Sequence, residues 1–311
     1  MRKLYALLLA AAVLLLAPPA RAADNGNWAV FPTSTAAAQR PYFYLSAAPG
    51  TTLADKVTVT NKTAAPMTFR LYGADAYNTE RDGGFAVRTQ RETQRGVGAW
   101  TRPDRSVVTV PAHASVTVPF TVTVPADAEP GDHPGALVAL DERIAAGSGQ
   151  LAMGVQQAVG ARVYLRVSGP AVPALAVEDV SLAQHRPLVP GTGTSRTVIS
   201  YTLHNRGNVT LNPKVELKAK GLFGRTLLSR ALTRIPAELL PGQTVRLSEP
   251  WSGSPQLDWG DVSLTASAKD TTGSGGASFL ALPWPAVGAL VAALAAGVVG
   301  WRLRRVRARR S

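Results

Sequence analysis

Hydrophobic and polar residues alternate in short runs along most of the chain, and the runs are rich in valine and threonine. Alternation with a period of two puts the apolar side chains on one face of a β-strand, and the prolines and glycines between runs are typical of turns. A first set of runs covers 55–61, 67–75, 106–111, 115–125, 135–142 and 160–169, and a second covers 175–183, 196–205, 213–221, 227–235, 242–251 and 261–270. The pattern therefore predicts an all-β protein with two tandem Ig-like antiparallel β-sandwiches, at 23–170 and 171–270.

The two ends of the chain break this alternation. Residues 1–22 begin with basic residues, continue in an apolar run and end in a small-x-small tripeptide, which together are typical of a cleaved secretory signal peptide. Residues 281–301 carry no charge, and 21 residues in a helix would cross about 30 Å of hydrocarbon. We expect a single transmembrane helix there, preceded by a polar linker at 271–280. The arginine-rich tail at 302–311 is expected to stay in the cytoplasm, with the N-terminus extracellular.

The net charge is explained by these ends. A formal charge of +13 would by itself indicate a nucleic-acid partner. Three basic residues lie in the signal peptide and six arginines in the tail, so the excess belongs to targeting and anchoring. We expect no nucleic-acid partner and a single-pass protein of the cell membrane. Arginine outnumbers lysine 26 to 7, which fits the GC-rich genomes of actinobacteria.

Motifs of catalysis and metal binding are missing from the sequence. The chain has no cysteine, no G-x-S-x-G elbow and no H-E-x-x-H. Four acidic or amide residues, at 75, 78, 80 and 82, lack the alternate spacing of a calcium loop. We therefore expect no enzyme, no metal and no cofactor. A hydrolase whose carboxylates meet only in space is the alternative.

An asparagine recurs at the end of one strand in each sandwich. Asn61 closes the run at 55–61, and Asn205 closes the run at 196–205; in both places a turn and another alternating run follow. An asparagine side chain hydrogen-bonds nearby backbone groups in such turns. The repetition predicts two related folds and a structural role for both residues.

Six stretches in the first sandwich share their order and spacing with one family of bacterial surface proteins. They are 41–50 (PYFYLSAAPG), 57–61 (VTVTN), 71–85 (LYGADAYNTERDGGF), 96–100 (GVGAW), 120–140 and 159–170. In them the chain resembles the peptidoglycan-binding domain of the WxL-interacting proteins. The resemblance implies an Ig-like fold, peptidoglycan as the partner, no catalysis, and display on a Gram-positive cell.

The second sandwich does not share this resemblance, and we expect it to be a spacer or a module that docks another surface protein. The alternative function is protein–protein adhesion or envelope assembly without glycan recognition.

The stretch 41–50 contains three neighbouring aromatic residues. Alternation puts Phe43 and Leu45 on one face of a strand and Tyr42 and Tyr44 on the other. Phe43 and Leu45 are the better pair to bury. The tyrosines are then either a platform on which a sugar stacks or a cover for the core beneath the insertion at 76–105. We expect Tyr44 to pack beneath the insertion and Tyr42 to lie at its rim.

The insertion at 76–105 is the longest polar connection in the chain, and such loops often carry function. It holds six arginines that would pair with the carboxylates of muramyl groups and stem peptides, or would simply be solvated. Trp100, at its end, is expected in the core. The candidate glycan-binding residues are Tyr42, Tyr44, Tyr77, Asn78 and Arg81.

Overall fold

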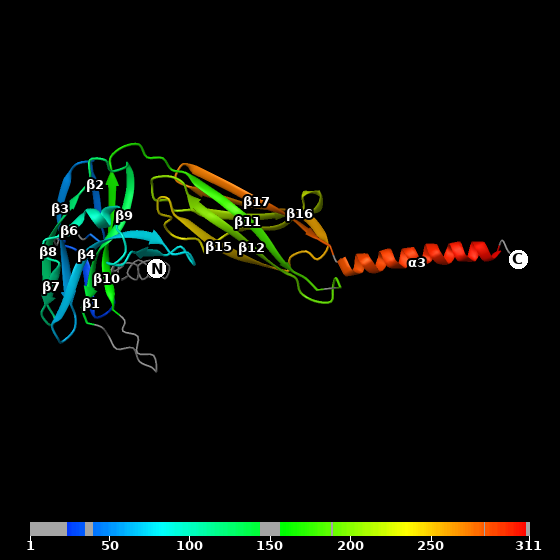
Figure 1. Cartoon of the computed structure of the whole chain (residues 1–311), viewed down its shortest axis with the longest axis horizontal. Helices are drawn as coiled ribbons and strands as arrows, with labels where there is room; N and C mark the ends of the chain where they lie inside the picture. Colours follow the sequence, from blue (N-terminus) through cyan, green and yellow to red (C-terminus); the bar gives the residue numbers. More distant parts are fainter. Residues whose placement is uncertain (1–23, 35–39, 144–155, 188, 283, 309–311) are drawn as a thin grey trace, which may run out of the picture. The chain divides into compact units, whose positions relative to one another are not determined.

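The computed structural model describes residues 24–34, 40–143, 156–187, 189–282 and 284–308 (Figure 1). The signal peptide expected at 1–22 lies outside the described residues. The chain divides into two compact units: unit 1 comprises Met1–Tyr77 and Val87–Pro170, and unit 2 comprises Asn78–Ala86 and Ala171–Ser311. Strands dominate both units, which confirms the prediction of an all-β fold.

Unit 1 is a sandwich of two sheets. Its elements are β1 (Trp28–Pro32), β2 (Phe43–Ala47), β3 (Thr52–Asn61), β4 (Met67–Asn78), β5 (Phe85–Val87), the short helix α2 (Val97–Trp100), β6 (Thr101–Pro103), β7 (Val107–Val110), β8 (Ser115–Thr123), β9 (Gly131–Asp141) and β10 (Ala158–Val167). One sheet has the order β1-β3-β8-β6 and the other β2-β10-β9-β4-β5, with β7 also paired with β4. β1 pairs antiparallel with β3, whereas β2 runs parallel to β10. The first two strands of the unit therefore belong to different sheets.

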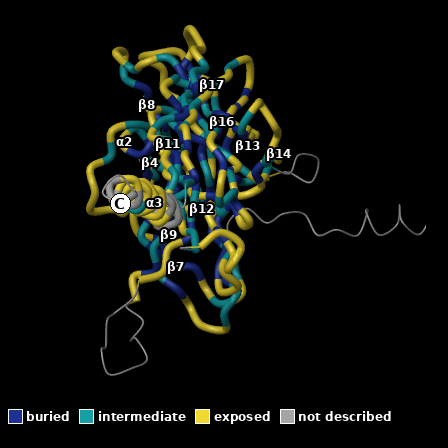
Figure 2. Tube along the Cα trace, turned by 90° about the vertical axis from the view of Figure 1, so that its right-hand side faces the viewer, coloured by how far each residue is buried: buried dark blue, intermediate teal, exposed yellow. Residues whose placement is uncertain are grey.

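Large apolar side chains fill the space between these sheets, and Figure 2 shows the buried residues along the strands. Trp28, Phe43, Phe69 and Phe120 are each no more than 1% exposed. The rings of Phe43 and Phe120, one from each sheet, meet edge to face with 5.0 Å between their centroids. Burial of such a side chain contributes about 1.5–3 kcal/mol, so these four residues anchor the fold without any disulfide.

Unit 2 is a second sandwich. Its elements are β11 (Leu175–His185), β12 (Arg196–Asn205), β13 (Lys214–Lys220), the 3-10 turn η1 (Leu222–Gly224), β14 (Thr226–Ala231), β15 (Thr244–Ser252), β16 (Asp258–Ala268), β17 (Thr271–Ala281) and the helix α3 (Trp284–Ala308). The sheets have the orders β11-β12-β15 and β14-β13-β16-β17. Trp251 on β15 and Phe279 on β17 meet edge to face at 5.8 Å between the two sheets. The second set of alternating runs thus forms the sandwich that the pattern predicts.

The polar linker predicted at 271–280 is wrong, because these residues form β17. The strand pairs with β16 over its whole length, from Asp258 opposite Ala281 to Ala268 opposite Thr271. The glycines of β17 allow the backbone of a neighbouring strand to come close, and they do not indicate a flexible segment. A Cβ on Gly273 would lie 2.3 Å from the backbone oxygen of Leu175 on β11, a position that only glycine fits.

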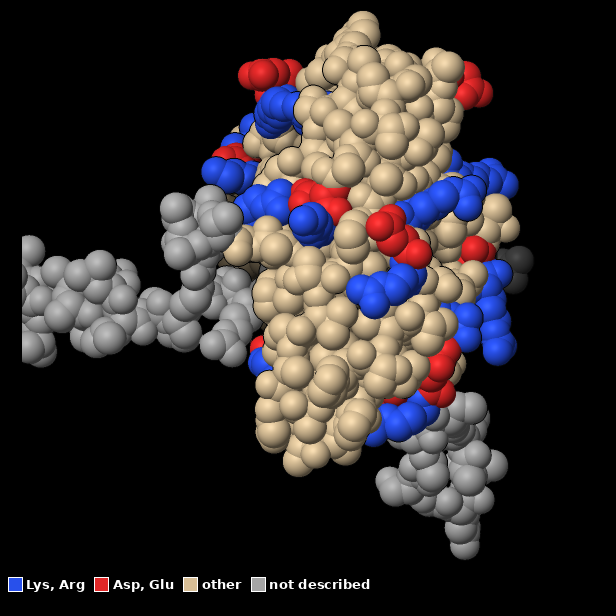
Figure 3. All heavy atoms as spheres, turned by 90° about the vertical axis from the view of Figure 1, so that its left-hand side faces the viewer, with Lys and Arg blue, Asp and Glu red and all other residues tan. Residues whose placement is uncertain are grey.

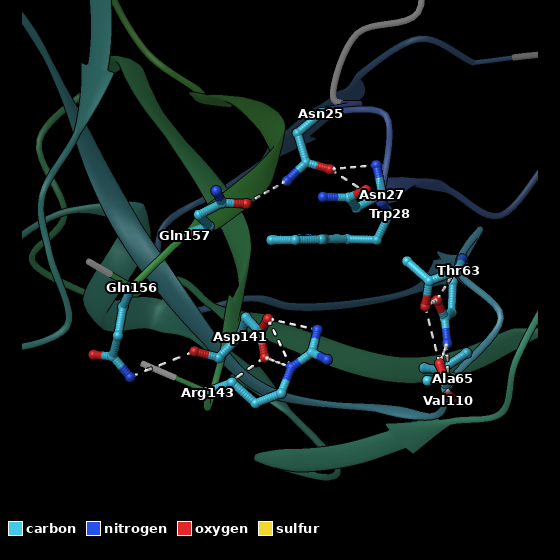
Figure 4. Close-up of polar contacts among 11 residues, drawn as sticks. Asn25, Asn27, Trp28, Thr63, Ala65, Val110, Asp141, Arg143, Gln156 and Gln157 are labelled. Carbon is cyan, nitrogen blue, oxygen red and sulfur yellow. Dashed lines mark hydrogen bonds and ion pairs between the residues drawn. The ribbon is translucent and has the colours of Figure 1, made fainter. Parts of the chain in front are cut away.

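The two asparagines at the strand ends make the same hydrogen bonds in the two units, and both are fully buried. The Asn61 carboxamide accepts the backbone N–H of Thr63 at 2.9 Å and donates to the carbonyl oxygens of Ala65, at 2.7 Å, and Val110, at 3.1 Å. Figure 4 shows Thr63, Ala65 and Val110 gathered at this corner.

In unit 2, Asn205 accepts from Gly207 at 3.0 Å and donates to Val209 at 2.8 Å and Leu239 at 2.9 Å. The structural role predicted for both asparagines is confirmed.

The insertion at 76–105 is partly folded onto unit 1. The carboxylate of Asp75 accepts the backbone N–H groups of Gly96, at 2.9 Å, and Gly98, at 2.7 Å, and so fixes the turn that contains α2. Trp100 follows, half-buried, packs against the core of unit 1 and contacts His133 at 4.8 Å between ring centroids. It lies at the margin of the core and not inside it as expected, since Val97 and Gly98 are the residues of α2 that are buried.

Residues Trp284–Ala308 form the helix α3. Within the part of the chain that the structure describes, we find no helix whose length and apolar character would suffice to cross a membrane. Several side chains of α3, among them those at 284–287 and 290, lie outside the described ones. The span expected at 281–301 stays a prediction.

Candidate functional site: the tyrosine cluster

A group of aromatic and basic side chains, partly open to solvent, lies where β2 pairs with β10. The parallel register places Tyr44 opposite Tyr164 and Phe43 opposite Val163. Since side chains alternate along each strand, Phe43 and Val163 point into the core while the tyrosines point outward. We call Tyr42, Tyr44, Arg162 and Tyr164 the tyrosine cluster.

The three rings contact one another directly. Tyr44 stacks on Tyr164 with 5.5 Å between centroids and 12° between planes. Tyr42 meets both rings edge to face, at 6.1 Å from Tyr44 and 5.7 Å from Tyr164. Tyr44 is 65% exposed, so the stack leaves much of its surface open to solvent.

Arg162 completes the cluster. Its guanidinium carbon lies 5.5 Å from the centroid of the Tyr42 ring, and its Nη1 donates a hydrogen bond to the Tyr164 hydroxyl at 3.0 Å. A cation over an aromatic face contributes about 0.5–1 kcal/mol at an exposed site, and an aromatic pair a similar amount. These contacts therefore hold the three rings in place relative to one another.

This geometry corrects the expectation for Tyr44. Tyr44 does not pack beneath the insertion at 76–105, because β2 lies at the edge of its sheet, separated from β4 by β10 and β9. Tyr42, expected at the rim of the insertion, is half-buried against the other two rings. The burial of Phe43 agrees with the alternation.

Sequence reasoning missed Arg162 and Tyr164. Alternation in GARVYLRV (160–167) already places them on the face opposite Val163 and Leu165. What the sequence does not show is that this strand lies beside residues 43–47. That pairing joins segments about 120 positions apart, and no turn between them marks it.

The other three candidate residues do not belong to β2 or β10, the strands of the cluster. Tyr77 is near the end of β4, where the guanidinium of Arg88 lies 5.9 Å from its ring centroid. Asn78 is buried in unit 2: its amide nitrogen donates to the carbonyl oxygens of Gly83 and Glu238, each at 2.7 Å, and its oxygen accepts the N–H of Leu240 at 2.8 Å. Arg81 is exposed. The structure thus gives Asn78 hydrogen bonds with backbone groups.

Three of the six arginines of the insertion line a polar hollow of about 590 Å³ in unit 1. Its walls include Arg88, Arg91 and Arg95 together with Asp75 and Glu92. Hydrogen bonds from Thr89 hold the pKa of Glu92 below its ordinary value, so this carboxylate stays charged and pairs with Arg88 at 3.5 Å. Guanidinium groups suit carboxylate ligands, which makes the hollow a second place where an acidic group can bind.

Charges elsewhere are mixed. Figure 3 shows Lys and Arg interspersed with Asp and Glu on the face it presents, with wide uncharged areas between them. Among the residues that the structure describes, no group of three or more His, Cys, Asp or Glu is placed to hold a metal ion.

The chain has distant structural similarities to known proteins. No protein-family model matches the chain, and no curated protein matches it. Among solved structures, a chaperone–tip adhesin complex of CFA/I fimbriae biogenesis is 11% identical, with a TM-score of 0.37, over 83% of this chain and 100% of that one.

The class 5 fimbriae chaperone CfaA is 12% identical, with a TM-score of 0.36 and the same coverage. The CsuC–CsuE chaperone–tip adhesion subunit complex of Acinetobacter baumannii is 10% identical, with a TM-score of 0.34, over 66% and 86%. Similarities with such low identities and TM-scores say nothing about the function of this chain.

Proposed function

We propose that the chain is a non-catalytic bacterial cell-surface protein, anchored in the membrane by one helix, whose unit 1 binds peptidoglycan at the tyrosine cluster. The observation that carries this proposal is the stack of the exposed Tyr44 on the half-buried Tyr164, with Arg162 beside it. Sugar rings present apolar C–H faces that pack on an open aromatic ring. Peptidoglycan adds carboxylates, which a guanidinium recognises. The resemblance of residues 28–170 to a peptidoglycan-binding domain supports the same ligand.

Two further parts of the proposal rest on the sequence. The uncharged segment 281–301, followed by six arginines, supports a membrane anchor with its C-terminus in the cytoplasm. Unit 2 then serves as a spacer between the membrane and unit 1, or docks another surface protein.

The test is sedimentation of the full chain, purified in detergent, with isolated cell-wall sacculi. We expect Tyr44→Ala and Tyr164→Ala each to weaken binding by about five- to tenfold, since a ring contact of about 1 kcal/mol is worth that factor. Phe31→Ala is the matched control, because Phe31 is an exposed aromatic of the same unit, on β1. Equal binding by wild type and both tyrosine variants would overturn the site, and no retention of the wild type would overturn the ligand.

The second candidate is a protein–protein assembly component that recognises no glycan. One observation favours it: in the described part of the chain β2 pairs on one side only, with β10, and so presents an edge to which a partner strand can add. A stoichiometric protein partner captured by crosslinking in cells, together with no retention on sacculi, would select it.

A further inference from the structure

One turn of unit 2 holds an aromatic residue out into solvent. Phe223, in η1, is 97% exposed and has a φ of 58°, a left-handed conformation that is uncommon for a bulky residue. The turn reverses the chain between β13 and β14, and Gly224 beside it also has positive φ. Solvated apolar rings in strained turns cost stability, so such a residue calls for a functional explanation.

A buried carboxylate keeps this turn in place. Asp258, with its side chain 2% exposed, accepts the N–H of Leu222 at 2.9 Å and pairs with Arg225 at 2.9 Å. It also accepts the N–H of Trp259 at 2.9 Å. The same carboxylate therefore fixes the turn that carries Phe223 and the start of β16. The exposed ring belongs to an ordered surface.

Other exposed, large apolar side chains line the same hollow as Phe223. Leu257 is 67% exposed and Trp259 57%. Trp259 lies opposite Leu280 on the paired strands β16 and β17, on the outer face of the sheet, and Leu280 is 48% exposed. We call Phe223, Leu257, Trp259 and Leu280 the apolar end of unit 2. The first three of them line a hollow of about 450 Å³.

The place of the apolar end in the chain indicates what covers it. The hollow is also lined by Ala281 and Leu282, and α3 begins two positions after Leu282, at Trp284. Residues 281–301 are the uncharged segment that we propose as the membrane anchor. The covalent chain thus keeps the apolar end within a few residues of the point where that helix would enter the bilayer.

We propose that the apolar end of unit 2 inserts into the outer lipid–water interface of the membrane and holds unit 2 against the bilayer. This proposal rests on the membrane anchor in the proposed function. Tryptophan and other aromatic rings favour that interface, where an apolar body meets a polar surface. Arg225, at the edge of the same turn, can keep its guanidinium at the level of the lipid phosphates while its stem lies along apolar surface. Unit 2 then contacts the membrane through the apolar end as well as through α3.

The test uses the absence of cysteine from the chain. Phe223→Cys, in the full chain reconstituted into phosphatidylglycerol-containing vesicles, is labelled with a polarity-sensitive fluorophore. We expect a blue-shifted emission and loss of fluorescence when the vesicles contain lipids with a nitroxide near the head group. Lys214→Cys is the matched control. It is exposed, and it lies at the other end of β13, about 20 Å from Lys220 at 3.3 Å per residue. Its label should stay in water and remain unquenched.

A second site and a second measurement separate the outcomes. Leu257→Cys reports on the same surface without altering the turn of Phe223, and quenching at both sites supports the proposal. Resistance of the wild-type chain to alkaline extraction from membranes reports on the anchor alone. A chain that resists extraction but shows no quenching at 223 and 257 keeps its anchor and overturns the apolar-end proposal. Labels at 223 and 257 that become protected only when another protein is added would also overturn the apolar-end proposal. A chain that is extracted overturns the anchor, and with it this proposal.

Discussion

Tyr44 stacks on Tyr164 across the parallel pair of β2 and β10, with 5.5 Å between the ring centroids. The two residues come from the first and last parts of unit 1, so the stack exists only once β2 has paired with β10. Phe43, one position before Tyr44, points the other way and is fully buried. Neighbouring aromatic residues on one strand thus have separate roles: one in the core, and one on a surface that the fold assembles.

Alanine substitutions at these two positions should separate the roles. Phe43→Ala should lower the free energy of unfolding by about 3–5 kcal/mol, because it leaves a cavity against Phe120. Tyr44→Ala should cost only about 0.5–1.5 kcal/mol, the worth of an aromatic pair, because its ring is mostly solvated. Thermal melts of the two variants measure the difference. Equal losses of stability would show that Tyr44 is part of the core.

Asn78 should behave as a structural residue. Asn78→Ala removes the hydrogen bonds to Gly83, Glu238 and Leu240 and leaves buried backbone groups without partners. We expect a loss of about 2–4 kcal/mol of stability. Arg81→Ala, at an exposed position close by, is the control and should change stability by less than about 0.5 kcal/mol. If Asn78→Ala melted like the wild type but bound sacculi less tightly, a direct ligand contact would be the better explanation.

Much of the fold follows from the sequence because alternation is a local signal. The run at 115–125 predicts β8 from its own alternation. Asn61 and Asn205 predict the turns that follow them, because the same pattern of strand, asparagine and turn occurs twice. The tyrosine cluster is harder to foresee. Tyr42 and Tyr44 are visible as a pair, but their neighbours on β10 are set by the pairing of distant strands.

The prediction of a linker at 271–280 was wrong for a different reason. A run of glycine, serine and threonine has the composition of a flexible segment, and composition alone cannot tell flexibility from close packing. Gly273 and Gly275 face the backbone of β11, where a side chain would not fit. The apolar residues at the end of the same strand, Phe279 and Ala281, are buried in the core of unit 2 and identify it as a strand.

Gly273→Ala should therefore destabilise unit 2. Its Cβ would lie 2.3 Å from the carbonyl oxygen of Leu175, and backbone on both strands would have to shift. Overpacking of this kind costs about 1–3 kcal/mol. Ser274→Ala, at the next and exposed position of β17, is the control and should melt with the wild type. An unchanged melt for Gly273→Ala would mean that β17 does not lie against β11.

Acid should destabilise unit 2 through the protonation of Asp258. The hydrogen bond from the Leu222 N–H, with those from Arg225 and Trp259, holds the pKa of this carboxyl below its ordinary value of 3.8. Because the folded pKa is lower than the unfolded one, the charged carboxylate stabilises unit 2 above pH 3.8, and this contribution is lost as the pH falls through the folded pKa.

Denaturant unfolding at a series of pH values should show wild-type stability falling below about pH 4, near the unfolded pKa of an aspartate. Asp258→Asn, which cannot ionise, should be less stable at neutral pH and should lose less on acidification. Arg225→Ala should have a smaller effect in the same direction, since the backbone hydrogen bonds of Leu222 and Trp259 remain. Parallel pH profiles for the wild type and Asp258→Asn would contradict this account, because the two differ only in the group that titrates.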